Sequence, residues 1–256
     1  MKAFSALLLP AAAALAVGIS ACGSVPVAET APSPPPAEEP NWPDPTRFED
    51  AIAEFEQQDA EEFPPPGAIL AIGSSSMRGW HGTIQRDLGF EEVLGEGRLR
   101  FIPRGFGGSF ISDVIHYADR IVLPYEPVAI LLYEGDNDVT YGIEPEDIAA
   151  AYVEFFEMVH EELPDTRIFV LSVKPSPARW DVWPQMQETN ELLEDICGQD
   201  ERLIFIDVAT PMLGEDGEPR EELYLSDMLH MNEEGYRVWT EAVRPVLGRY
   251  IAVPAP

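Results

Sequence analysis

The chain has 256 residues and a formal net charge of −30, because 46 Asp and Glu stand against 16 Lys and Arg. Phosphate-binding surfaces need clustered Lys and Arg, so this composition argues against a nucleic-acid partner. Hydrophobic residues make up 45% of the chain, and its length suits one packed globular domain better than two.

The N-terminus has the composition of a secretory signal. An apolar run from Leu7 to Val17 follows a single lysine and is short for a membrane span. It ends in Ile19-Ser20-Ala21-Cys22-Gly23, which resembles a bacterial lipobox. The resemblance implies that residues 1–21 are a lipoprotein signal peptide and that Cys22 then carries the lipid anchor, including palmitate. The alternative is an ordinary signal peptide with an incidental cysteine.

The residue after this cysteine is Gly23 and not aspartate. In lipoproteins of this type, that choice fits the outer membrane rather than retention at the inner one. The sequence therefore predicts a lipid-anchored protein of the bacterial cell envelope, at the outer membrane and facing the periplasm or the cell surface.

Residues 22–45 are rich in Pro, Ala, Glu and Ser and contain few large apolar groups, which predicts a disordered tether. The folded domain is predicted over residues 46–252. It opens with a helix, because apolar residues recur at the spacing of one helix face at Phe48, Ala51, Ile52 and Phe55.

The next stretch predicts a strand, a tight turn and the start of a helix. The apolar run Ala68–Ile72 stops at Gly73, and three serines follow. Glycine permits a sharp turn at the end of a buried strand. A serine just beyond such a turn is lifted clear of the sheet beside the free N–H groups of the helix, where it can act as a nucleophile. The alternative is that these serines only cap a helix.

Apolar runs and helical patterns then alternate along the chain. Four further strands are predicted near residues 99–103, 128–133, 167–173 and 203–208. Helices are predicted over about 111–122, from Pro145 onward, over 181–197, and after Asn232 as a cap. This alternation predicts an α/β fold, a three-layer α/β/α sandwich around a five-stranded parallel sheet. In such sheets, functional sites lie beyond the carboxyl ends of the strands.

Four separated segments should meet at that edge of the sheet. They contribute Ser75, Gly108, Asn137 and the pair Asp227 and His230. A histidine can take the proton of a serine hydroxyl, and a carboxylate three residues earlier can orient its ring. The Ser75 N–H, the Gly108 N–H and the Asn137 amide can then stabilise the negative charge of an acyl-transfer intermediate.

These segments resemble the motif blocks of the SGNH (GDSL) hydrolase family, over about residues 46–252. The blocks match at Gly73-Ser74-Ser75, Gly107-Gly108-Ser109, Gly135-Asp136-Asn137-Asp138 and Asp227-Met228-Leu229-His230. The resemblance implies the flavodoxin-like fold of that family and catalysis by Ser75, Asp227 and His230. It also implies an oxyanion hole made by Ser75, Gly108 and Asn137. Ser74 replaces an aspartate that many members have, but that aspartate is not one of the four catalytic groups.

The resemblance implies a serine esterase that acts on a small-molecule ester without a cofactor or a metal. The Gly-Ser-Ser-Ser segment is similar to the acetylhydrolase-like and carbohydrate-esterase-like members, which implies short-chain O-esters. The alternatives are a lysophospholipase-like or lipase-like esterase, an acyltransferase, and a catalytically silent surface lipoprotein that binds a ligand. The oligomeric state is left open.

Some competing roles involve the same region of the chain. His81 is the main rival of His230 as the base, because it also lies close to Ser75 in sequence, but it has no carboxylate at a suitable spacing. Glu134, Asp136 and Asp138 suggest a metal site, yet no His or Cys cluster accompanies them.

Basic and aromatic residues also fall near the expected site edge. They are Arg78, Arg104, Lys174, Trp80, Trp180 and Trp183. Flat aromatic rings suit the apolar faces of sugars, and cationic groups hold carboxylates or polar head groups. They therefore indicate a polar, sugar-like alcohol as the substrate's leaving group. The alternative is that the tryptophans fill the core and the arginines pair with surface acids.

Overall fold

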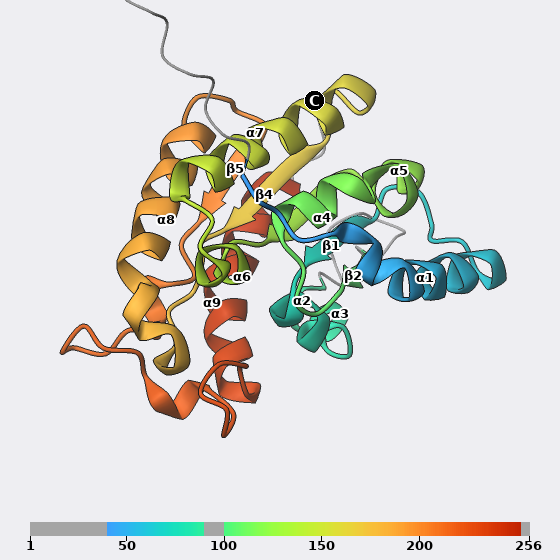
Figure 1. The fold of residues 1–256 in the computed structure, drawn as a ribbon. Coiled ribbons are helices and arrows are strands. Elements are labelled where there is room, and N and C mark those ends of the chain that lie inside the picture. The colour runs from blue at the N-terminus through green and yellow to red at the C-terminus, as the bar shows by residue number, and fades with distance from the viewer. Residues whose placement is uncertain (1–39, 90–99, 252–256) are drawn as a thin grey trace, which may run out of the picture. The chain divides into compact units, whose positions relative to one another are not determined.

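The computed structural model describes residues 40–89 and 100–251. They contain a five-stranded sheet, and Figure 1 shows the helices that surround it. Its strands are β1 (Ile69–Gly73), β2 (Phe101–Gly105), β3 (Ala129–Tyr133), β4 (Arg167–Leu171) and β5 (Leu203–Ile206). They lie in the order β2-β1-β3-β4-β5, and every pairing is parallel. The predicted α/β fold with five parallel strands is therefore confirmed.

Nine α-helices occur in the described residues. They are α1 (Glu49–Glu61), α2 (Ser75–Trp80), α3 (Ile84–Leu88), α4 (Ile111–His116), α5 (Ala118–Ile121), α6 (Asp136–Tyr141), α7 (Pro145–Glu162), α8 (Trp183–Cys197) and α9 (Glu233–Ile251). Asn232 caps α9 as predicted, because its Oδ1 accepts the Glu234 and Gly235 N–H groups at 2.9 and 3.1 Å.

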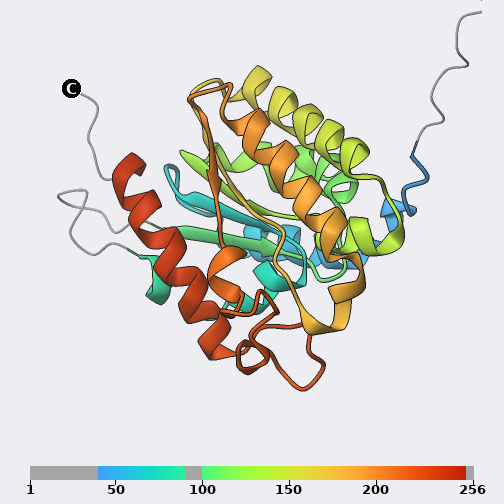
Figure 2. The ribbon, with the colours of Figure 1, turned by 90° about the vertical axis from the view of Figure 1, so that its left-hand side faces the viewer.

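The helices form one layer on each face of the sheet. Successive side chains of a strand point to opposite faces, and β1 shows this clearly. Leu70 and Ile72 join a core with residues of α1, α4, α5, α7 and α8. Ile69 and Ala71 join a second core with residues of α2, α3 and α9. In Figure 2, α9 (red) accordingly lies on the opposite side of the strands from α7 and α8.

The predicted helix over 111–122 is broken in the structure. Tyr117 leaves the helical region at φ −100° and ψ 6°, which separates α4 from α5. Its ring is buried, and its hydroxyl donates to the Pro45 carbonyl at 2.9 Å. This packing of a distant segment against Tyr117 is a tertiary contact that helical periodicity does not reveal.

The carboxyl ends of β1 and β2 pack closely against β3 and α2, respectively. Gly73 has φ 140°, and a Cβ there would lie 2.0 Å from the Tyr133 carbonyl oxygen. A Cβ on Gly105 would lie 2.4 Å from the Arg78 backbone nitrogen. Only glycine fits both positions. The strand order also reverses at β1, which is the topological position where open α/β sheets bind ligands.

The predicted signal peptide, Cys22 and most of the predicted tether lie outside the described residues. Within residues 40–89 and 100–251, no helix is both long enough and apolar enough to cross a membrane.

Candidate active site

Ser75 is the first residue of α2, and a single residue, Ser74, separates it from the end of β1. Ser74, the residue before the helix, is fully buried, and Ser76 is 2% exposed. Ser75 is half-buried. Of the three consecutive serines, Ser75 is therefore the one whose side chain has substantial access to solvent.

The loop after β2 lies against this serine. A Cβ on Gly107 would be 3.6 Å from the Ser75 Cβ. The next residue, Gly108, is exposed and has φ 89°, with open space on its side-chain side. In the described part of the chain, no hydrogen bond takes the backbone N–H of Ser75 or Gly108. Both groups are thus free to donate to a ligand.

Asn137 lies in the first turn of α6, directly beyond β3. Its Nδ2 donates to the Ser109 carbonyl at 2.9 Å, which ties the loop after β3 to the loop after β2. Its Oδ1 accepts a hydrogen bond from Arg179 Nη2 at 3.0 Å. One N–H of the amide remains for a further acceptor, because the NH₂ group carries two donors.

Asp227 and His230 form a hydrogen-bonded pair on the loop before α9. His230 Nδ1 lies 2.7 Å from Asp227 Oδ2. The other carboxylate oxygen accepts the backbone N–H groups of Leu229 and His230, both at 3.0 Å. These bonds, with the His230 side chain as the largest contributor, lower the pKa of Asp227 to about 2. The carboxylate is therefore ionised at neutral pH and fixes the orientation of the ring.

The structure brings the predicted site residues to one edge of the sheet by several separate contacts. Ser75 meets the Gly107–Gly108 loop, and that loop meets Asn137. The loop of Asp227 and His230 is joined to the segment after β4, because Lys174 donates to the Leu229 carbonyl at 3.0 Å. Among the described residues, no hydrogen bond joins Ser75 to His230. Hydrogen bonds between catalytic groups are often loose before substrate binds, and both side chains retain exposed surface.

His81, the rival histidine, is engaged differently. Its Nε2 accepts the backbone N–H of Gly105 at 2.8 Å. Burial, together with the nearby Arg104 and Arg78 charges, lowers the pKa of His81 to about 4. The ring nitrogen that faces β2 is thus already occupied, and His81 supports the strand end.

Two of the three acidic residues after β3 accept hydrogen bonds from the loop after β2 or from their own turn. Glu134 accepts the Ser109 hydroxyl at 2.5 Å, and Asp138 accepts the N–H groups of Ile111 and Gly135 at 3.0 and 3.1 Å. Burial raises the pKa of Asp138 to about 7 and raises that of Glu134 well above its ordinary value. Over residues 40–89 and 100–251, no cluster of three or more His, Cys, Asp or Glu side chains is placed to hold a metal ion.

Three of the basic and aromatic side chains expected at the site edge are structural. Arg104 is buried, forms an ion pair with Asp59 and donates to the Tyr125 hydroxyl at 2.7 Å. Trp80 is fully buried against Trp239. Trp183 is also buried. The expectation that these three face substrate is wrong. Arg104 packs against α1, Trp80 packs against α9, and Trp183 is the first residue of α8.

Lys174 is also buried, and only Arg78 and Trp180 keep surface near the site. Lys174 is 1% exposed and donates to the Leu229 carbonyl at 3.0 Å. Trp180 is half-buried and stacks on Trp183, with the two ring centroids 5.7 Å apart. Arg78 is exposed, and its Nη1 would lie 3.1 Å from a Cβ on Gly107. No motif in the sequence pointed to Arg179, because its contact with Asn137 depends on how distant segments pack.

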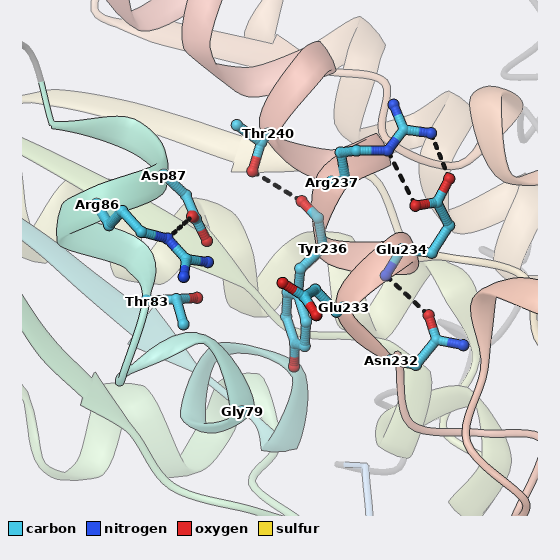
Figure 3. Close-up of a pocket in the computed structure, with 10 residues that line it drawn as sticks. All are labelled: Gly79, Thr83, Arg86, Asp87, Asn232, Glu233, Glu234, Tyr236, Arg237 and Thr240. Atoms are coloured by element: carbon cyan, nitrogen blue, oxygen red, sulfur yellow. Dashed lines mark hydrogen bonds and ion pairs between the residues drawn. The ribbon is translucent and has the colours of Figure 1, made fainter.

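A surface pocket of about 820 Å³ lies between α2, α3 and the start of α9 (Figure 3). Ser75, Asp227 and His230 are not among its lining residues. Figure 3 shows the Arg237 guanidinium directed at the Glu234 carboxylate and Arg86 directed at Asp87. Both arginines of the lining are thus paired with carboxylates of the same pocket, and Glu233 leaves the lining with a net negative charge.

Known structures share this fold. A GDSL-like lipase from Bacteroides thetaiotaomicron VPI-5482 is 17% identical, with TM-score 0.62, over 77% of this chain and 97% of that one. A candidate platelet activating factor protein from Streptococcus pneumonia is 20% identical, with TM-score 0.65, over 78% and 92%. An acetyl-xylooligosaccharide esterase variant from Geobacillus Stearmophilus is 15% identical, with TM-score 0.56, over 74% and 97%.

Sequence comparison identifies the family. No curated protein matches the chain. The profile of the GDSL-like Lipase/Acylhydrolase family matches residues 71–238, which is more than half of the chain and includes every residue of the candidate site. The chain therefore belongs to the GDSL-like lipase/acylhydrolase family and is a hydrolase of the SGNH type.

Proposed function

We propose that this protein is a serine esterase that cleaves short-chain O-acyl esters, with Ser75 as the nucleophile. The observation that carries the proposal is the Asp227–His230 hydrogen bond of 2.7 Å. It leaves Nε2 of His230 as the basic nitrogen, on a loop that reaches the same edge of the sheet as Ser75.

The reaction follows from these positions. The Ser75 hydroxyl gives its proton to His230 Nε2 while its oxygen attacks the ester carbonyl carbon. The carbonyl oxygen becomes an oxyanion, which accepts hydrogen bonds from the backbone N–H groups of Ser75 and Gly108 and from the second side-chain N–H of Asn137. The tetrahedral intermediate collapses, and His230 returns the proton to the departing alcohol. Water then attacks the acyl-serine by the same sequence of proton transfers, which releases the acid and restores Ser75.

The proposed substrate is a small acyl group, such as acetyl, on a polar and sugar-like alcohol. Half-buried Trp180 offers part of a flat ring, and its stacking on Trp183 holds that ring in place. Arg78 lies beside the Gly107 loop, and it has no ion pair or hydrogen bond within residues 40–89 and 100–251. An unpaired guanidinium is unusual in so acidic a chain and suits a polar substituent of the alcohol.

A second candidate is a lysophospholipase-like or lipase-like esterase. Two apolar side chains flank Asp227 on the surface: Leu225 is 50% exposed and Met228 is 37% exposed. An exposed apolar pair beside the catalytic loop is a surface on which a longer acyl chain could lie.

An ester panel with increasing acyl length separates the two candidates and tests the esterase itself. We expect acetyl esters to be cleaved much faster than octanoyl esters, and Ser75→Ala to retain only a trace of activity. Trp180→Ala should raise KM for an acetylated sugar more than for an aryl acetate. A preference for long chains would favour the lipase-like candidate, and full activity of Ser75→Ala would refute the proposed nucleophile.

We also propose that the mature protein is anchored in the bacterial cell envelope through lipid on Cys22, at the outer membrane. The lipobox-like segment supports this proposal. Cys22→Ser should abolish fatty-acid labelling and release the protein from the membrane fraction. Membrane association that is unchanged in this variant would contradict the proposal.

A further inference from the structure

The amide of Asn137 is held from both of its ends. Nδ2 donates to the Ser109 carbonyl at 2.9 Å, and Oδ1 accepts from Arg179 Nη2 at 3.0 Å. The two ends of an amide have opposite hydrogen-bonding character, since one only donates and the other only accepts. A guanidinium can only donate, so its contact with Oδ1 is compatible with one orientation of the amide. In that orientation the second N–H of Nδ2 is available to another acceptor.

Arg179 is itself fixed in position. Its Nη1 lies 3.3 Å from Oδ2 of Asp136, and the two side chains are 17% and 3% exposed. Asp136 directly precedes Asn137 at the start of α6. One guanidinium therefore contacts two consecutive residues, which a planar group with several fixed donors does well.

The same network reaches the loop that carries His230. Asp136 Oδ2 lies 3.7 Å from Lys174 Nζ, and Lys174 donates to the Leu229 carbonyl at 3.0 Å. In addition, the Ala178 N–H donates to the Met228 carbonyl at 3.0 Å. The segment from Lys174 to Arg179 thus contacts both Asn137 and the two residues before His230.

We propose that Arg179 is a positioning residue, which orients the Asn137 amide so that an N–H faces the oxyanion. This inference rests on the proposed role of Asn137 in the oxyanion hole. Without Arg179, only the Ser109 carbonyl holds the amide. The amide then turns more freely away from the position in which its second N–H faces the developing negative charge. Through Asp136 and Lys174, Arg179 also keeps the position of the amide fixed relative to the loop that carries His230.

A double-mutant cycle in the full chain tests the proposal. Arg179→Met should lower kcat about 10- to 100-fold and leave KM within about twofold, because orientation of the amide matters most in the transition state. In the Asn137→Ala background, adding Arg179→Met should cause no further loss beyond about twofold, because there is no amide left to orient. Arg179→Lys keeps one donor and should recover part of the lost kcat.

Arg167→Met is the matched control, since Arg167 is exposed and begins β4, at the amino ends of the strands and away from the candidate site. The kcat of this variant should be unchanged. Losses that multiply in the double variant would overturn the positioning role, because Arg179 would then act independently of Asn137. An effect of Arg179→Met on KM alone would overturn it too. If Asn137→Ala kept full kcat, the proposed role of Asn137 in the oxyanion hole would be refuted. That result differs from multiplying losses, which would refute only the positioning role of Arg179.

Discussion

The two histidines considered as the base for Ser75 differ in the hydrogen bonds that their ring nitrogens make. His81, just after α2, is mostly buried, and its Nε2 accepts a backbone N–H from the end of β2. His230, before α9, is half-exposed and pairs through Nδ1 with the Asp227 carboxylate. In His230 the carboxylate binds Nδ1 and leaves Nε2 for the proposed proton transfer. In His81, Nε2 accepts the Gly105 N–H and so stabilises the end of β2.

This difference favours His230 as the proposed base, on the ground of its bonding partners rather than its distance along the chain from Ser75. His81 is six residues from Ser75, whereas His230 is separated from it by most of the domain. The parallel sheet brings the distant loop to the strand ends, and the partner carboxylate then orients the ring.

The largest expected effect separates these two histidines directly. His230→Ala should lower kcat by about 10⁴-fold or more, as loss of a base in a serine hydrolase does. His81→Gln, which keeps a hydrogen-bond acceptor for the Gly105 N–H, should stay within about tenfold of the unmodified protein. Steady-state kinetics on a short-chain ester measures both. Equal loss in the two variants would break the comparison.

Removing the charge of Asp227 should have the next largest effect. Asp227→Asn keeps the size of the side chain but allows the wrong tautomer of His230, so we expect kcat to fall about 10³- to 10⁴-fold. The circular dichroism spectrum should be unchanged, because Asp227 is exposed. Glu215→Gln, an exposed acid earlier in the same long loop, is the control. A fall confined to KM would count against an orienting carboxylate.

Loss of one oxyanion donor should be milder. Asn137→Ala should lower kcat about 10²- to 10³-fold with little change in KM, because the amide is proposed to act mainly on the transition state. Kinetics across a range of substrate concentrations separates the two constants. A change in KM with normal kcat would mean that Asn137 only binds the ground state.

The smallest expected effect is on the stability of the fold, and it tests whether His81 is a buried neutral histidine. The fold lowers the pKa of His81 to about 4, whereas an ordinary histidine titrates near ~6.5. Below pH ~6.5 the unfolded chain therefore binds a proton that the folded chain refuses, so this contribution to stability is lost as the pH falls toward 4.

His81→Gln should remove that part of the pH dependence, which is on the order of 2 kcal/mol after allowance for partial exposure of the ring. Urea unfolding at several pH values between 4 and 7 measures it for both proteins. The same slope in the two proteins would show that His81 is not a buried neutral base.

The sequence was sufficient for the parallel sheet and for the elements that carry the candidate site. Apolar runs such as residues 128–133 correspond to buried strands, and each motif follows the predicted strand or precedes the predicted helix. Asp227 and His230 could be paired from their spacing alone, because His230 follows Asp227 by three positions in the same loop.

Long-range side-chain contacts could not be predicted in this way. Arg104 lies one residue before the end of a strand that reaches the site, yet its side chain turns to Asp59 in α1. Arg179 meets Asn137 across 42 residues of sequence. Both contacts depend on how separate elements pack, and neither has a local pattern of spacing or composition.

Covalent labelling with a fluorophosphonate tests the central claim most directly, because only an activated serine reacts rapidly with it. We expect one label per chain, located on Ser75 by peptide mass analysis and much slower to form in His230→Ala. Ser74→Ala and Ser76→Ala are matched controls, since both side chains are buried, and they should still be labelled. Absence of labelling, or labelling that persists in Ser75→Ala, would contradict the account.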